Sequence, residues 1–251
     1  MNSQFLGRTN EAFSPVWLRL TEDNSGIAGQ ANDLAIAAAK AGAVLDVSAN
    51  PAKWGGLLRG TNAMVMACGG EFLQATESAD QASDFLQAHL LELLCSVGRQ
   101  TLDFYFLNLP RTLEEFQIQS ALETLEIAKQ EGTIRFSGIH ASGEPFAALG
   151  HWQFNDAFEV ALVPRNLLDE EAYNVLGGLA QERRVGLIAN RPLGVQRVPI
   201  LDQSGPEDET SAQILKSYLE QHTCLIPVSD SRQIQWLQSK NLGLEIPRIA
   251  K

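Results

Sequence analysis

The sequence predicts one (β/α)8 barrel that spans residues 1–251, and three observations support this fold class. Eight short apolar runs have the character of strands, and nearly every one is followed by a segment with the apolar spacing of a helix. This alternation is typical of a parallel sheet, and eight parallel strands close a barrel at about 250 residues. The hydrophobic content of 45% is enough to fill such a core.

The elements follow one another in a regular order. The expected strands are Val16–Leu20, Ala43–Val47, Ala63–Cys68, Asp103–Asn108, Ile134–His140, Phe158–Val163, Val185–Asn190 and Thr223–Pro227. The expected helices lie near 28–41, 80–97, 112–131, 144–150, 168–182, 208–221 and 230–240, and PAKWGGLLRG after the second strand is the least helical connection. A doubly wound open sheet is the alternative fold, although no GxGxxG motif follows any strand.

The helix near 112–131 is marked by its ends. Thr112 is the expected N-cap, Glu115 completes a capping box, and Gly132 follows the last turn. Between Leu113 and Ala128 the apolar residues largely follow i, i+3, i+4 spacing, so this helix has one face to bury.

Composition excludes several classes of function. A net charge of −11 and a pI near 4.8 argue against binding to nucleic acid or to an anionic membrane, because phosphates would be repelled. The sequence contains neither a signal-like start nor an apolar stretch long enough to span a membrane. Three separated cysteines and four scattered histidines offer no disulfide framework and no metal-binding motif. We therefore expect a cytoplasmic protein without a metal site.

The carboxyl ends of the strands are where such a barrel carries its functional residues. Here these ends are Asp46, Cys68, Asn108, His140, Arg165-Asn166, Asn190-Arg191 and Val228-Ser229. The run LDFYFLNLP shows the pattern clearly, since an apolar strand stops at Asn108 and Pro110 ends its pairing. The strand thus delivers an amide, which can form hydrogen bonds but cannot titrate near neutral pH.

Seven segments, in the right order along nearly the whole chain, resemble the aldo-keto reductase family. FLGRT is similar to the N-terminal hairpin of that family, and ALETLEIAKQEGTIRFSGIHAS closely follows one of its helix–strand units. The other five segments are AGAVLDVSANP, SVGRQTLDFYFLNLP, VPRNLLD, VGLIANRPLG and LIPVSDSRQIQWL. The resemblance implies the same barrel.

The resemblance also implies which positions would carry catalysis. The family reduces carbonyls with a nicotinamide hydride; a tyrosine donates the proton, a lysine lowers its pKa, an aspartate holds the lysine and a histidine orients the substrate. Asp46 matches the aspartate, but Pro51 stands at the tyrosine position and Asn108 at the histidine position. The lysine position falls on Cys68 or a neighbour, none of which is a lysine. Without the tyrosine and lysine, most of the catalytic rate should be lost.

The positions that the resemblance assigns to the cofactor are only partly kept. His140-Ala141 replaces the pair that holds the carboxamide, and Leu162 and Arg165 replace the glutamine and the stacking aromatic residue. The phosphate-facing residues are better kept, namely Arg191, Gly194, Ser229 and Arg232. Asp230 nevertheless places a negative charge where an adenosine 2′-phosphate would lie. We expect no bound cofactor, with NADP(H) as the alternative.

Two strand-end residues have a structural and a functional interpretation. Asp46 is a catalytic relic or, as we favour, a buried acid in an ion pair with Lys53, Arg165 or Arg191. Asn108 contacts a ligand or, as we favour, caps neighbouring backbone.

The same two interpretations apply to the other strand-end residues. Cys68 is a nucleophile with His140 as its base or, as we favour, a plain buried thiol, and His140 itself is expected to form hydrogen bonds rather than act as an acid. Arg165 and Arg191 either receive a carboxylate or phosphate together or pair with acidic side chains, and the residues do not decide between these.

Three functions remain open. The first is a catalytically degenerate aldo-keto reductase-like barrel that acts as a binding, regulatory or complex-forming protein. The second is an NADP(H)-dependent oxidoreductase of carbonyl substrates that uses non-standard residues such as His140 or Cys68, and the third is another enzyme with an anion site at Arg165 and Arg191. The expected partner is another protein subunit or a small anionic ligand. Aromatic anchors for a protein would be sought among Trp17, Trp152, Phe154 and Trp236, although burial is the expected state of such side chains.

Overall fold

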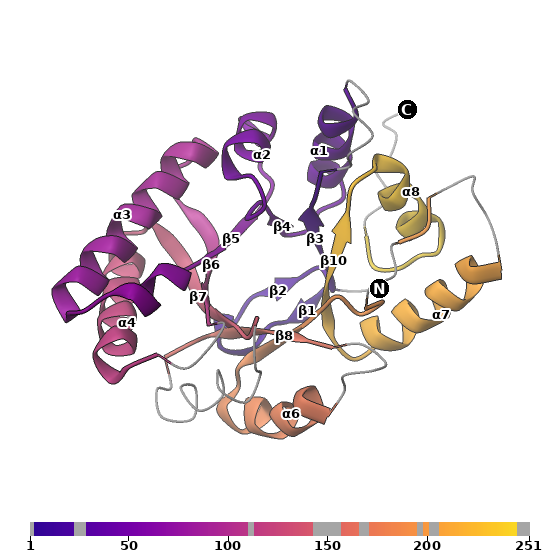
Figure 1. Ribbon diagram of the computed structural model, residues 1–251. Helices are drawn as coiled ribbons and strands as arrows, with labels where there is room; N and C mark the ends of the chain where they lie inside the picture. Colours follow the sequence, from indigo (N-terminus) through magenta and orange to yellow (C-terminus); the bar gives the residue numbers. More distant parts are fainter. Residues whose placement is uncertain are drawn as a thin grey trace.

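The computed structural model describes residues 3–22, 29–109, 113–142, 157–165, 171–194, 198–200 and 206–244. Eight parallel strands form a closed barrel in the order β10-β3-β4-β5-β6-β7-β8-β9, and the helices lie outside it (Figure 1). The predicted (β/α)8 barrel is therefore confirmed.

All eight expected strands are present, each within two residues of its predicted ends. They are β3 (Val16–Leu20), β4 (Leu45–Asp46), β5 (Val65–Gly69), β6 (Leu102–Asn108), β7 (Ile134–His140), β8 (Val160–Pro164), β9 (Gly186–Asn190) and β10 (Thr223–Val228). An antiparallel hairpin of β1 (Gln4–Phe5) and β2 (Ala12–Phe13) precedes them, as the resemblance implied. The described helices are α1 (Gln30–Lys40), α2 (Pro51–Leu58), α3 (Ala79–Val97), α4 (Glu115–Gln130), α6 (Glu171–Arg183), α7 (Pro206–Leu219) and α8 (Ser231–Ser239).

Two apolar cores arise from the alternation of side chains along the strands. One core lies between the strands and the surrounding helices and includes Tyr105. The other fills the inside of the barrel with Trp17, Phe104 and Phe106, and Phe13 of the hairpin packs against them. The lumen is therefore filled by aromatic rings, and only the last lumen-facing residues of the strands remain for a site.

The segment PAKWGGLLRG forms helix α2, so the expectation that it is poorly helical is wrong. Asn50 is the N-cap, since its side chain accepts a hydrogen bond of 3.2 Å from the backbone N–H of Lys53, and Pro51 occupies the first helical turn. These start signals outweigh the two glycines. Gly55 packs directly against Val97 of helix α3.

Replacing Gly55 with alanine is expected to destabilise the fold by about 1–3 kcal/mol through overpacking. A Cβ at this position would lie 2.3 Å from the Cα of Val97, and backbone cannot move aside as a side chain can. Gly56→Ala is the matched control, because nothing lies within 4 Å of its Cβ and alanine is the better helix former. Urea denaturation of both variants measures the difference; equal stabilities would contradict the close α2–α3 contact.

Helix α4 begins later than predicted. Glu114 is its N-cap, and the side chain of Gln117 accepts a hydrogen bond of 2.9 Å from the Glu114 backbone N–H. The predicted capping box of Thr112 and Glu115 is therefore wrong, and Thr112 itself lies outside the described residues. Gly132, with a φ of +76°, ends the helix as predicted.

Other expectations about the helices and aromatic residues have mixed outcomes. The helix expected at 144–150, together with Trp152, Phe154 and Asn166, lies outside the described residues. Trp17 and Trp236 are buried, with 0% and 1% of their surface exposed, so neither is a surface anchor. No helix in the described ranges has both the length and the hydropathy that a membrane crossing requires.

Candidate functional site

A layer of polar side chains closes the top of the aromatic lumen. In three strands, the residue two positions beyond a lumen-facing apolar residue is polar and, by the alternation of side chains, faces the same interior. Trp17 is thus followed by Arg19 in β3, Phe106 by Asn108 in β6, and Ile188 by Asn190 in β9. Asp46 of β4 and His140 of β7 join this layer, which we call the mouth layer: Arg19, Asp46, Asn108, His140 and Asn190.

Asp46 forms a buried ion pair with Arg19. The Nε of Arg19 lies 2.6 Å from Oδ2 of Asp46, whose side chain is completely buried. The other carboxylate oxygen accepts hydrogen bonds from the Ser48 hydroxyl and backbone N–H, at 2.5 and 3.0 Å. The predicted ion pair is confirmed, but its partner is neither Lys53, which pairs with Glu22 at 3.3 Å, nor Arg165 or Arg191.

Arg19 was absent from the residues that the sequence placed at the site. The sequence does contain a signal for Arg19, because it is the single charged residue in the apolar run VWLRL. Burying such a charge is costly unless it is paired. Strand register supplies the pair, because Arg19 lies directly opposite Asp46 between β3 and β4.

Asn190 connects this ion pair to His140. The carboxamide oxygen of Asn190 accepts a hydrogen bond of 3.3 Å from Nη1 of Arg19, which turns its NH2 group toward Nε2 of His140, also at 3.3 Å. Since Nε2 then accepts, the neutral imidazole carries its hydrogen on Nδ1. Nδ1 is buried and has no hydrogen-bond partner among the described residues. Burial, with further contributions from the positive charges of Arg19 and Arg191, lowers the pKa of His140 to about 4.

We expected Asn108 to cap neighbouring backbone. Among the described residues it instead forms a hydrogen bond with a side chain. Its NH2 group donates to Oε1 of Glu71 in the 3-10 turn η2 (Glu71–Ala75). Its carboxamide oxygen is buried and has no partner within the described ranges. Asn108 therefore holds an unused acceptor next to His140, the residue directly opposite it on β7.

Cys68 lacks the surroundings of a nucleophile. Burial raises the pKa of its thiol, and the nearby negative charge of Asp46 raises it further. Among the described residues no hydrogen bond joins this thiol to His140, which has the lowered pKa given above. The geometry thus favours an unreactive thiol over a nucleophile, although Cys68 is half-buried and not fully buried as expected.

The sequence contains three tyrosines, and all of them lie outside the barrel wall. Tyr105 of β6 faces the helix layer, where its ring centroid lies 6.1 Å from that of His89. Tyr173 of α6 and Tyr218 of α7 flank the guanidinium of Arg165, which lies 4.4 and 4.9 Å from the two ring centroids. No tyrosine therefore joins the mouth layer, and Pro51 is the first residue of α2.

Arg165 and Arg191 are not brought together as a pair. Arg165 is held between the two tyrosine rings in the helix layer. Arg191 directly follows β9, is exposed and has a left-handed φ of +55°. A turn closed by a hydrogen bond of 2.8 Å from the Gly194 N–H to the Arg191 carbonyl follows it. Only Arg191 is left as a candidate to receive an anion near the mouth layer.

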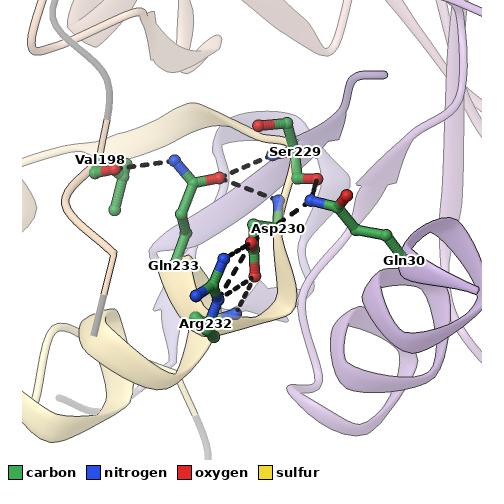
Figure 2. A network of polar contacts seen from close by, with 6 residues as sticks. All are labelled: Gln30, Val198, Ser229, Asp230, Arg232 and Gln233. Carbon is green, nitrogen blue, oxygen red and sulfur yellow. Dashed lines mark hydrogen bonds and ion pairs between the residues drawn. The ribbon is translucent and has the colours of Figure 1, made fainter. Parts of the chain in front are cut away.

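The start of α8 is stabilised by its own carboxylate (Figure 2). Asp230 is the N-cap and accepts a hydrogen bond of 2.8 Å from the Arg232 backbone N–H. The guanidinium of Arg232 folds back on the same carboxylate, with Nη2 2.5 Å from Oδ2. The hydrogen bonds from Arg232 lower the pKa of Asp230. An anion at the positive end of this helix is thus already supplied by the chain itself.

Ser229 belongs to the same network. Its backbone N–H and that of Asp230 both donate to Oε1 of Gln233, at 2.7 and 3.1 Å. The NH2 group of Gln233 donates to the carbonyl of Val198 at 2.7 Å, and that of Gln30 reaches Asp230 Oδ2 at 3.3 Å (Figure 2). The backbone N–H groups of Ser229, Asp230 and Arg232 at the start of α8 therefore already donate to side chains of the protein and are not free for a phosphate. No cluster of three or more metal-ligating side chains exists in the described part of the chain.

Solved structures resemble this barrel along its whole length. The apo form of the aldo-keto reductase AKR11C1 from Bacillus halodurans matches with a TM-score of 0.70 and 15% identity, covering 100% of this chain and 93% of that chain. The fold is that of the aldo-keto reductases. The holo form of AKR11C1 matches equally well over 98% of this chain and 92% of that one, and an aldo-keto reductase from Brucella melitensis shares 14% identity over 96% and 93%, both with a TM-score of 0.70.

The aldo-keto reductase fold that the sequence segments implied is therefore confirmed by structure. No protein-family model and no curated protein matches the chain. The aldo-keto reductase scaffold is one on which oxidoreductases are built, and the mouth layer lies at the carboxyl ends of its strands, where this kind of barrel places its active sites.

Proposed function

We propose that this chain is a catalytically degenerate aldo-keto reductase-type barrel that acts in the cytoplasm by binding rather than by reducing carbonyls. The observation that carries the proposal is the ion pair between Arg19 and Asp46, 2.6 Å apart, in which an arginine of β3, and not a lysine near Cys68 as in the resemblance, neutralises the aspartate. A guanidinium satisfies the aspartate but stays protonated at any physiological pH. It cannot therefore take part in moving a proton.

The other groups in the mouth layer, and the residues that the resemblance places next to it, are poor proton donors. A general acid must carry an exchangeable proton at the working pH. With its pKa lowered to about 4, His140 is neutral near pH 7 and can donate a hydrogen bond but not readily a proton. The raised pKa of Cys68 keeps its thiol from acting as a nucleophile. Pro51 has no donor at all.

An NADP(H)-dependent oxidoreductase is the second candidate function, and the match to the holo form of AKR11C1 favours it. Arg191 is exposed at the start of the turn that ends at Gly194, where the resemblance places the phosphate-facing residues. The start of α8 fits a phosphate poorly, because Asp230 already occupies the cap and holds Arg232. If the cofactor binds, it would supply a hydride, while the chain would contribute orientation through Arg191 and the neutral imidazole of His140.

Two measurements test the proposal. NADPH is added up to about 1 mM, the upper end of ordinary KM values, with tryptophan fluorescence as the binding signal. NADPH oxidation is then followed with a panel of aldehydes and ketones. We expect no turnover above that of a buffer blank, whether or not the nucleotide binds. Steady oxidation that disappears in His140→Ala would overturn the proposal and establish the oxidoreductase. The expected partner of the binding function is a small anionic ligand or another protein subunit.

A further inference from the structure

The mouth layer contains one buried donor and one buried acceptor, on neighbouring strands, that have no partner in the part of the chain that the structure describes. The donor is the Nδ1–H of His140, because the hydrogen bond from Asn190 fixes the tautomer, and the acceptor is the carboxamide oxygen of Asn108. Asn108 and His140 are register partners on neighbouring strands, which lie about 4.8 Å apart. Buried polar groups are nearly always satisfied, so this pair indicates a missing group with both an acceptor and a donor.

The surroundings of His140 and of Asn108 differ in charge. Arg191 is exposed, has no ion-pair partner among the residues that the structure describes, and directly follows Asn190, whose side chain contacts His140. Its positive charge contributes to the lowered pKa of His140. The charge of Arg19, by contrast, is neutralised by Asp46. On the other side, Glu71 lies behind Asn108 and accepts its NH2 group. An anionic group is therefore favoured on the His140–Arg191 side, and a neutral donor on the Asn108 side.

We propose that the mouth layer binds a small 2-hydroxycarboxylate, whose carboxylate lies between His140 Nδ1–H and the Arg191 guanidinium and whose hydroxyl donates to Asn108. This inference rests on the proposed binding function and names its ligand class. A hydroxyl on the carbon next to a carboxylate supplies a donor and an acceptor at the short spacing that neighbouring strands require. The Asp46–Arg19–Asn190 chain acts here as a positioning device, since it fixes which nitrogen of His140 carries the hydrogen.

The test compares lactate with propionate, two carboxylates that differ only in the hydroxyl. Affinities are measured by isothermal titration calorimetry near pH 7 in a buffer without carboxylate or phosphate. Lactate is expected to bind about tenfold more tightly than propionate, because propionate leaves the Asn108 oxygen unsatisfied. The imidazole resonances of His140, followed by nitrogen-15 NMR, should report an Nδ1–H tautomer that shifts on addition of lactate.

Two arginines at opposite ends of β9 give matched variants. Arg191 follows the strand and Arg184 precedes it; both are exposed and both have a left-handed φ, of +55° and +54°. Arg191→Gln is expected to weaken lactate binding about tenfold or more, whereas Arg184→Gln should leave it unchanged. Thermal unfolding verifies that both variants fold.

Three results would overturn the inference: no binding of lactate, equal affinity for lactate and propionate, or equal weakening by the two arginine variants. None of these bears on NADPH turnover, which tests the proposed function separately. Conversely, turnover of NADPH would remove the degenerate-enzyme proposal without deciding whether lactate binds at Asn108 and His140.

Discussion

Replacing Arg19 with methionine is expected to lower the free energy of unfolding by about 3–5 kcal/mol at pH 7, the usual cost of breaking a buried ion pair from one side. Methionine approximates the volume of the arginine stem but leaves the carboxylate of Asp46 without a cation. Since the Asp46 side chain is completely buried, its carboxylate would be left in the interior without a counter-ion, which is costly. Urea denaturation followed by circular dichroism measures the change.

Two controls separate this effect from a general loss of charge. The double variant Arg19→Met/Asp46→Asn removes both charges and should recover much of the stability, which also keeps the test valid if the single variant does not fold. Lys240→Met breaks an exposed pair with Glu209, 3.5 Å apart, and should cost at most about 1 kcal/mol. A loss for Arg19→Met no larger than that for Lys240→Met would show that the Asp46 ion pair has little weight in the fold.

Acidification is expected to destabilise the protein through His140. The pKa of this side chain is lowered from 6.5 to about 4 in the fold, so between these values the unfolded chain binds a proton that the folded chain does not. The contribution of His140 to the free energy of unfolding is thus complete above about pH 6.5 and is lost as the pH falls toward 4. At about 1.4 kcal/mol per pKa unit, the loss approaches about 3 kcal/mol at the acidic end and about 2 kcal/mol near pH 5.

The contribution of His140 is isolated by comparing the protein with His140→Gln. The groups that act on the imidazole are Arg19 and Arg191, which lower its pKa, and Asp46, which raises it, and all three are retained in the variant. His222, whose pKa is also lowered to about 4, titrates equally in both proteins and cancels in the difference. Urea denaturation at several pH values, in buffers without carboxylate, should give a flatter profile for the variant. Parallel profiles would mean that the fold does not withhold a proton from His140.

The architecture could be predicted from the sequence because its signals are local. A strand of about five apolar residues and a helix with one apolar face are each recognisable without their neighbours, and eight of them in alternation leave few topologies. The error at α2 has the same local origin: glycines in PAKWGGLLRG obscured the N-cap of Asn50 and the proline after it. Asp46, Asn108, His140 and Asn190 lie at the carboxyl ends of their strands as expected, since chain order and strand polarity define which end each residue reaches.

The partners of those residues were decided by the tertiary structure alone. Asp46 pairs with Arg19 because β3 and β4 are joined in a register that sets the two opposite each other. Arg165 and Arg191 both follow a strand, yet one is held between two tyrosines in the helix layer and the other lies near His140. Whether a side chain faces the lumen or the helix layer, and which neighbour it contacts, depends on strand register and on closure of the sheet. These are properties of contacts between distant segments, so the sequence determined the barrel and its polar mouth, and the packed structure determined the connections within that mouth.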